Sequence, residues 1–295
     1  MKTYYRYMGA SKMEVVTSIK KMQEICLDLR TKGSTIGFIP TMGYLHEGHL
    51  TLMETARKAN DIVITSVFVN PLQFGPNEDF DKYPRDAAGD EDKARNVGVD
   101  YFFYPHVDEM YPKKLATTMT VTAGANVLCG SSRPGHFDGV VTVLAKLFNL
   151  VLPHKVYMGT KDAQQVAVVT QLVADYNVPT EIVPVPTVRE SDGLAKSSRN
   201  VYLSDEERMQ SPKIYAALLN AKAFIEQGET NPKTVITKLK SDLSLIEGAI
   251  VDYAHMYSYP ALENMTTIDE RIVLAVAVKF TNARLIDNII IEIGE

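Results

Sequence analysis

Short apolar runs alternate with segments of helical periodicity through much of this chain. The apolar runs are 35–39, 62–69, 101–104, 155–158 and 181–188, and the helical patterns cover about 12–31, 48–60, 87–97, 138–151 and 163–176. The runs are apolar at consecutive positions, as expected for strands that helices cover on both faces. The pattern therefore predicts an α/β fold with a buried parallel sheet, whose ligands bind at the carboxyl ends of the strands.

The pattern changes after about residue 188. Ser204 and Glu207 have the spacing of a capping box, which predicts a helix to about Gln227, and Asn231–Pro232 predicts the start of another. Three strand-like runs follow, at 250–257, 271–280 and 285–293. We therefore expect a first domain over residues 1–187 and a smaller α+β domain over residues 188–295.

Composition narrows the classes of partner and compartment. The 295 residues carry a formal net charge of −5, and proteins that grip nucleic acid are usually basic, so we expect no nucleic-acid partner. No apolar run reaches the ~18 residues of a membrane helix, and residues 1–13 lack the apolar core of a secretory signal. The two cysteines, Cys26 and Cys129, lack metal-ligand spacing, so we expect reduced thiols in a cytoplasmic protein.

Two histidines, His46 and His49, stand where an apolar run leads into a helix. The free N–H groups of a helix start attract anions, and imidazole donors there can stabilise charge that develops on an attacked α-phosphate. Gly48, which has no Cβ, lets a phosphate approach the backbone. Together with the distant Lys196–Asn200 cluster, this helix start resembles that of nucleotidylyltransferases, which attack the α-phosphate of ATP and expel pyrophosphate.

Other interpretations of these histidines exist. One ring can cap the helix while the other packs, which would make the pair inert. A zinc site is disfavoured because no third ligand is nearby. Gly43 and Gly48 have the spacing of a P-loop, but His49 and Leu50 stand where a P-loop needs Lys and Ser or Thr. The sequence Gly-x-Gly-x-x-Gly is absent, so a dinucleotide dehydrogenase has no support.

Two further groups of polar residues fit a nucleotide and a small acid. Lys161 stands at a strand-to-helix junction, and Lys196–Asn200 follow the hinge residue Gly193, so both segments can reach ATP phosphates. Amides near strand ends, in Asn70–Phe74 and at Gln164–Gln165, can hold a small polar acid. The alternatives are a solvated lysine, an ordinary polar loop and structural glutamines. The loop that begins at Arg133 can form a lid or a pocket wall.

Six motifs occur together and in order. They are Pro-Thr-Met-Gly-x-Leu-His-x-Gly-His (40–49), Phe-Val-Asn-Pro-x-Gln-Phe (68–74), Tyr-Pro-Arg (83–85), Arg-Pro-Gly-His-Phe-x-Gly-Val (133–140), Gly-x-Lys-Asp-x-Gln-Gln (159–165) and Asp-Gly-Leu-Ala-x-Ser-Ser-Arg-Asn (192–200). Together they closely resemble the pantothenate synthetase (pantoate–β-alanine ligase) family, over nearly the whole chain. The resemblance implies a Rossmann-like parallel-sheet domain followed by a lid domain.

The resemblance also implies an activity. It is the ATP-dependent condensation of pantoate with β-alanine, through a pantoyl-adenylate and with Mg²⁺, to give pantothenate (a coenzyme A precursor), AMP and pyrophosphate. A homodimer is expected on the same ground. Two other functions stay open: adenylyl transfer by the same fold to a different acid or phosphate, and a catalytically silent nucleotide-binding regulator.

The resemblance assigns roles to individual residues. The catalytic set is His46, His49, Lys161, Ser197, Ser198 and Arg199. Pantoate is expected at Gln73, Gln165, Pro40 and Met42. ATP is expected at Met42, Gly43, His49, Gly159, Lys161, Asp162, Val188, Lys196, Ser197, Ser198 and Arg199. Lys196 stands where the family often has Met. Asp90 is the candidate metal ligand, with a solvated helix face as its alternative.

Overall fold

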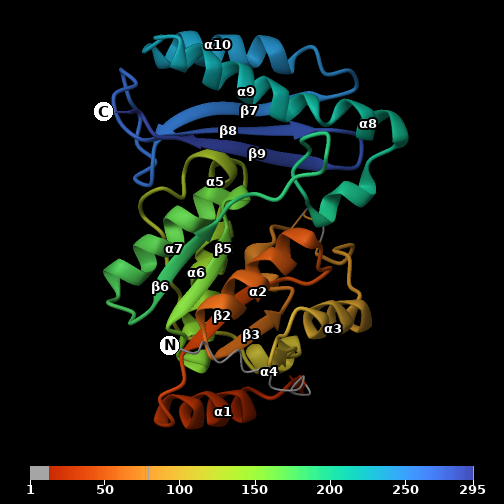
Figure 1. Ribbon diagram of the computed structural model, residues 1–295, viewed down its shortest axis with the longest axis vertical. Coiled ribbons are helices and arrows are strands. Elements are labelled where there is room, and N and C mark those ends of the chain that lie inside the picture. The colour runs from red at the N-terminus through yellow and green to blue at the C-terminus, as the bar shows by residue number, and fades with distance from the viewer. Residues whose placement is uncertain (1–12, 77, 79, 295) are drawn as a thin grey trace, which may run out of the picture.

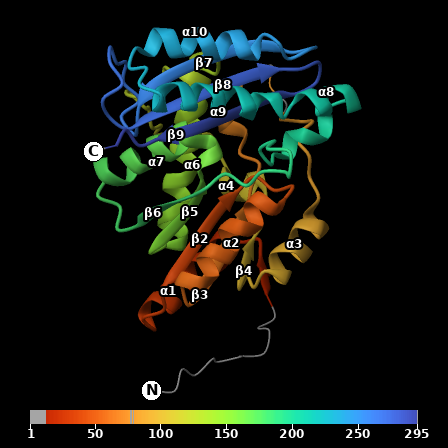
Figure 2. The same cartoon turned by 45° about the horizontal axis from the view of Figure 1, so that its top comes forward.

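The computed structural model describes residues 13–76, 78 and 80–294, and it contains two sheets (Figures 1 and 2). The larger is a parallel sheet with the strand order β1-β4-β3-β2-β5-β6. Its strands are β1 (Glu14–Val16), β2 (Ile36–Thr41), β3 (Ile62–Val67), β4 (Tyr101–Phe103), β5 (Lys155–Gly159) and β6 (Glu181–Val185). The expectation about a secretory signal falls on residues 1–13, of which 1–12 lie outside the described residues.

Helices cover both faces of this sheet, as the consecutive apolar runs predicted. They are α1 (Ile19–Thr31), α2 (Glu47–Ala59), α3 (Ala87–Asn96), α4 (Val107–Met110), α6 (His136–Val151) and α7 (Ala163–Asp175). The short helix α5 (Leu128–Ser132) packs instead against the smaller sheet. One core cluster joins α1, α6 and α7 to the sheet through side chains such as Leu147 and Phe38. The other joins α2 and α3 to the opposite face, through side chains such as Met53 and Ile39.

The smaller sheet is antiparallel, with the order β7-β8-β9. Its strands are β7 (Ile250–Ser258), β8 (Ile272–Lys279) and β9 (Arg284–Ile291), accompanied by α8 (Asp205–Gln210), α9 (Lys213–Glu226) and α10 (Pro232–Leu243). Figure 1 shows α9 and α10 on its outer side and α5 on its inner side. The inner face packs on the larger domain, because Tyr257 and Val273 share a cluster with Leu128 and Ala163. The α/β fold with a smaller α+β part is therefore confirmed, whereas the division at 187/188 stays a prediction.

Two expected helices were wrong in their extent. The helix expected from residue 12 begins only at Ile19, where the Ser18 side chain accepts from the backbone of Lys21. Val15 belongs instead to β1 and pairs with Phe102 of β4. The single helix expected over 204–227 is α8 and α9, divided at Pro212, which has no N–H to continue the first helix. Within the described residues, no helix is both long and apolar enough to span a bilayer.

Candidate active site

A cavity of about 240 Å³ lies at the carboxyl ends of β2, β3 and β5, as expected for an open parallel sheet. Most of the expected site residues line it: Pro40, Met42, His46, His49, Gln73, Gly159, Lys161, Asp162, Gln165, Val188, Lys196, Ser197, Ser198 and Arg199. Gly43 and Asp90 do not; they line a neighbouring cavity of about 230 Å³ that also touches Met42. Segments more than a hundred residues apart therefore meet at one place.

A larger cavity of about 510 Å³ adjoins the first on the side of the smaller sheet. Both are lined by Lys161, Gln165 and Arg199. The larger one also contains Lys279 and Arg284, at the end of β8 and the start of β9. Sequence reasoning missed these two cations, because charges that flank apolar strands look like ordinary strand ends.

His46 and His49 each use one ring nitrogen to accept a backbone hydrogen bond. Nδ1 of His46 accepts from the backbone N–H of Gly48 at 3.1 Å, and Nδ1 of His49 accepts from the backbone N–H of His46 at 3.3 Å. An Nδ1 that accepts must be unprotonated, so a neutral ring carries its proton on Nε2. Both rings, whose centroids lie 4.1 Å apart, therefore offer Nε2–H as a donor. We considered helix capping as an alternative role for these histidines. Capping uses only Nδ1, so it leaves Nε2–H available to a ligand.

Burial keeps both imidazoles neutral at pH 7. Burial, together with the nearby charge of Lys161, lowers the pKa of His46 to about 4. Burial also holds the pKa of His49 well below its ordinary value, with His46 and Lys161 acting in the same direction. The rings are thus hydrogen-bond donors rather than fixed cations.

Gly48 is required by the packing of the His46 ring. A Cβ at position 48 would lie 2.8 Å from Cε1 of His46, closer than such contacts allow. Gly48 also lines the cavity. The glycine therefore makes room for the imidazole, in addition to any approach of a phosphate.

The 188–200 segment folds back over the loop at 42–46, between β2 and α2, which ends at His46 and is called the histidine loop below. The backbone N–H of Lys196 donates to the carbonyl of Val188 at 2.9 Å, which makes a hairpin. Oγ of Ser198 donates to the carbonyl of Tyr44 at 3.3 Å. Nζ of Lys196 lies 3.2 Å from Glu47, at the start of α2, and 2.7 Å from Glu190 in its own hairpin. Lys196 therefore links this segment to the histidine loop.

Strand β9 binds two loops of the site: the 188–200 segment, and the turn that carries Lys161. Asp287 accepts two hydrogen bonds from the guanidinium of Arg189, at 2.7 and 2.9 Å. Nδ2 of Asn288 donates to the backbone carbonyls of Thr160 and Lys161, at 3.0 and 2.8 Å. Sequence reasoning missed both residues, although an Asp-Asn pair inside an apolar strand was a signal, because buried polar side chains need partners.

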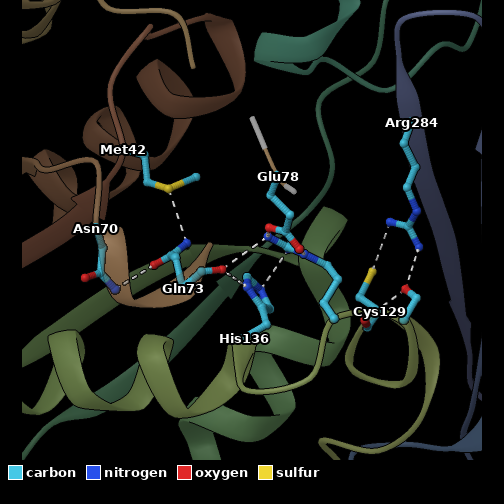
Figure 3. Close-up of polar contacts among 9 residues, drawn as sticks. Met42, Asn70, Gln73, Glu78, Cys129, His136 and Arg284 are labelled. Carbon is cyan, nitrogen blue, oxygen red and sulfur yellow. Dashed lines mark hydrogen bonds and ion pairs between the residues drawn. The ribbon is translucent and has the colours of Figure 1, made fainter. Parts of the chain in front are cut away.

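Gln73 belongs to η1 (Pro71–Gln73) and is held from several sides (Figure 3). Its Oε1 accepts from Asn70 at 3.1 Å, and its Nε2 lies 3.2 Å from the sulfur of Met42. Nδ1 of His136 donates to its backbone carbonyl at 2.8 Å. A thioether is a weak acceptor, so a ligand oxygen can replace the Met42 contact.

Arg133 and His136 form part of the cavity wall, as the position of their loop suggested. Nε of Arg133 donates to Glu78 at 2.7 Å, and its Nη1 lies 3.1 Å from Nε2 of His136. Burial and the charge of Arg133 lower the pKa of His136 to about 4. Burial, with the charge of Arg133 acting in the same direction, therefore keeps this imidazole neutral beside Gln73.

The two consecutive glutamines have different surroundings. Gln164 is buried, and its amide binds only backbone groups: the carbonyls of Gly124 and Val127 and the N–H of Cys129. Gln165 lines both cavities. The structural interpretation therefore fits Gln164, whereas the binding of pantoate by Gln165 stays a prediction.

Asp90 does not have the surroundings of a metal ligand. It is only 1% exposed, so the solvated-face alternative is wrong. Both its oxygens accept backbone N–H groups, from Leu45 at 2.6 Å and from Tyr44 at 2.8 Å. Across the described part of the chain, no group of three or more His, Cys, Asp or Glu side chains has an arrangement that could hold a metal. The contacts of Asp90 thus do not fit the resident Mg²⁺ that we expected there.

Comparison with known proteins identifies the family. The family model for pantoate-beta-alanine ligase matches residues 14–290. The chain belongs to the pantoate–β-alanine ligase family. A pantothenate synthetase of Bacillus thuringiensis subsp. konkukian is 57% identical to this member of the family, over 95% of this chain and the whole of that protein.

Solved structures of pantoate–β-alanine ligases have the same architecture. A pantothenate synthetase from Thermus thermophilus aligns with a TM-score of 0.88 at 43% identity, over 94% of this chain and 99% of that one. A pantoate-beta-alanine ligase from Francisella tularensis, solved in complex with beta-gamma ATP and beta-alanine, aligns with a TM-score of 0.76 at 35% identity, over 94% and 97%. The family that the sequence resembles is thereby confirmed.

Proposed function

We propose that this chain condenses pantoate with β-alanine at the expense of ATP, giving pantothenate, AMP and pyrophosphate. The observation that carries this proposal is the convergence of His46, His49, Lys161 and residues 197–199 on a cavity that Gln73 and Gln165 also line. The relative solved with beta-gamma ATP and beta-alanine supports two of the three substrates.

The first step is adenylation. A carboxylate oxygen of pantoate attacks the α-phosphorus of ATP, the bond to the β-phosphate oxygen breaks, and pyrophosphate leaves. Nε2–H of His46 and His49 donates to the charge that develops on the phosphoryl oxygens. Lys161, Ser197, Ser198 and Arg199 hold the departing phosphates. Gln73 and Gln165 orient pantoate, beside Pro40 and Met42.

The second step is amide formation. The neutral amine of β-alanine attacks the carbonyl carbon of the pantoyl-adenylate, AMP leaves with the bonding electron pair, and the amine loses a proton. The adenylate is a mixed anhydride that water hydrolyses. The 188–200 segment, which lies over the histidine loop, excludes water from it.

We propose that Mg²⁺ enters with ATP, as part of the substrate. Mg²⁺ keeps several waters and is usually held by substrate phosphates with one or two carboxylates. Asp162 can supply such a carboxylate, because it lines the cavity close to where the phosphates bind in this proposal. One of its oxygens lies 3.9 Å from Nζ of Lys161, the residue that we expect to hold those phosphates. Gly43, Gly159, Val188 and Lys196 complete the ATP site in this proposal.

The same proposal includes three further expectations, which concern the oligomeric state, the cellular compartment and the domain division. The family leads us to propose a homodimer, which a mass measurement in solution tests. The free thiols of Cys26 and Cys129 suit a reducing cytoplasm. The domain division at 187/188 falls between β6 and the hairpin that closes over the site.

Isotope exchange tests the proposed reaction. We expect the enzyme to exchange labelled pyrophosphate into ATP when pantoate and Mg²⁺ are present and β-alanine is absent, because adenylation needs no amine. Oxygen-18 in the pantoate carboxylate should appear in AMP once β-alanine is added.

Other outcomes point to other reactions. Exchange with a different acid but not with pantoate would indicate another adenylyl transferase of this fold. The absence of exchange and of AMP formation under all conditions would leave a nucleotide-binding regulator. Oxygen-18 in free phosphate would reveal phosphoryl rather than adenylyl transfer.

Hydrogen exchange tests the closing segment. We expect backbone amides at 188–200 to exchange about tenfold more slowly when ATP and pantoate are bound, because bound phosphates hold the segment against the site and suppress its local opening. Amides in β8, which is buried in the smaller domain, serve as the internal reference. Equal exchange at 188–200 with and without saturating ligands would contradict a closing role.

A further inference from the structure

The loop between β2 and α2 has an unusual backbone immediately before the histidines. Gly43 has a φ of 89° and Tyr44 a φ of 52°. Positive φ is natural for glycine but costs free energy for a residue with a Cβ. The Tyr44 conformation therefore persists only if contacts from outside the loop hold it.

Helix α3 supplies these contacts. Asp90 accepts the N–H groups of Tyr44 and Leu45 on its two oxygens, at 2.8 and 2.6 Å. Lys93, one turn further along the helix, donates from Nζ to the carbonyl of Leu45 at 2.9 Å. Residues three apart lie on the same face of a helix. One face of α3 thus binds two N–H groups and one carbonyl of the loop.

These contacts lead directly to the histidine rings. The carbonyl of Leu45 and the N–H of His46 belong to one rigid peptide plane. That N–H donates to Nδ1 of His49 and so keeps the proton of the neutral ring on Nε2. By fixing this plane through the carbonyl, Lys93 fixes the donor that sets the orientation and tautomer of His49.

The preceding peptide plane connects to the closing segment. The N–H of Leu45, which Asp90 accepts, shares its plane with the carbonyl of Tyr44. That carbonyl accepts from Oγ of Ser198. Asp90 therefore holds the N–H side of this peptide plane, and the 188–200 segment binds its carbonyl side.

We propose that Asp90 and Lys93 are positioning residues, which fix the Tyr44–Leu45 backbone and thereby aim His46 and His49 at the reacting phosphate. This inference rests on the proposed function, in which the two imidazoles act on the α-phosphate. It differs from a metal role, because the carboxylate binds backbone N–H groups with both oxygens.

The test compares two aspartates of α3. Asp90→Asn keeps one carbonyl acceptor but turns an NH₂ group toward the other N–H of the loop. We therefore expect kcat to fall ~10- to 50-fold. Each KM should stay within about threefold of the parent value, because the variant loses positioning in the transition state and not substrate binding. Asp92→Asn, at an exposed position of the same helix, should behave like the parent. Thermal melting checks folding, and Lys93→Met, expected to lower kcat in the same direction, replaces Asp90→Asn if that variant does not fold.

A double-mutant cycle separates positioning from general destabilisation. In a background that lacks both imidazoles (His46→Ala with His49→Ala), Asp90→Asn should cost less than about threefold, because both rings that it positions are gone. An equal loss in both backgrounds would overturn the proposal. Recovery of kcat at raised Mg²⁺ would also overturn it and assign Asp90 to a metal. A parent enzyme without pyrophosphate exchange would instead reject the proposed function.

Discussion

His49→Ala is expected to lower kcat by about 10²–10³, the usual cost of removing one donor to a developing oxyanion. The fold fixes the orientation and the tautomer of this donor, because Nδ1 of His49 accepts from the backbone N–H of His46 and burial keeps the ring neutral. KM for ATP and pantoate should change little, because the contact strengthens only as charge develops. His46→Ala should lose a similar factor in rate, and about 1 kcal/mol of stability as well, because it also removes a helix cap.

Steady-state kinetics and thermal melting on the same preparations decide this prediction. The matched control is His255→Ala, an exposed histidine of β7, which should keep parent kinetics. If His49→Ala turns over near the parent rate while remaining folded, the imidazole has no role in the chemical step.

The sequence predicted the larger sheet well, because each buried parallel strand reads as an uninterrupted apolar run. It failed at β1, since Val15 fits a helical pattern locally and becomes a strand only by pairing with Phe102. The break between α8 and α9 was visible in advance, because Pro212 stood inside the expected helix. Pairing partners distant along the chain are what local patterns lack.

The site was predictable where chemistry depends on residue type and motif order. His46, His49 and Lys161 line the cavity as expected. Their supporting contacts were not predictable, because they come from distant segments: Asn288 binds the carbonyl of Lys161, and Asp90 binds the loop before His46. Asp90 illustrates the limit, since a sequence resemblance gives a residue a role without giving its hydrogen-bond partners.

Lys161→Ala is expected to lower kcat/KM for ATP by about 10²–10³, because a cation that clamps phosphate oxygens acts in a site shielded from water. Its backbone is fixed by Asn288, and its side chain is 19% exposed at a point where both cavities meet. Lys161→Arg keeps the charge but not the compact ammonium, so we expect only partial recovery.

The pattern across substrates makes the Lys161 prediction specific. Lys155→Ala, at the opposite end of β5, removes a lysine that pairs with Glu181 and should leave the kinetics unchanged. Gln165→Ala should raise KM for pantoate and leave KM for ATP near the parent value, because its amide orients the acid. Titration of each substrate at saturation of the other two measures both effects. If Gln165→Ala weakens ATP use while Lys161→Ala weakens only pantoate use, the two binding regions are exchanged, and the carboxylate of pantoate, not the triphosphate, lies against Lys161.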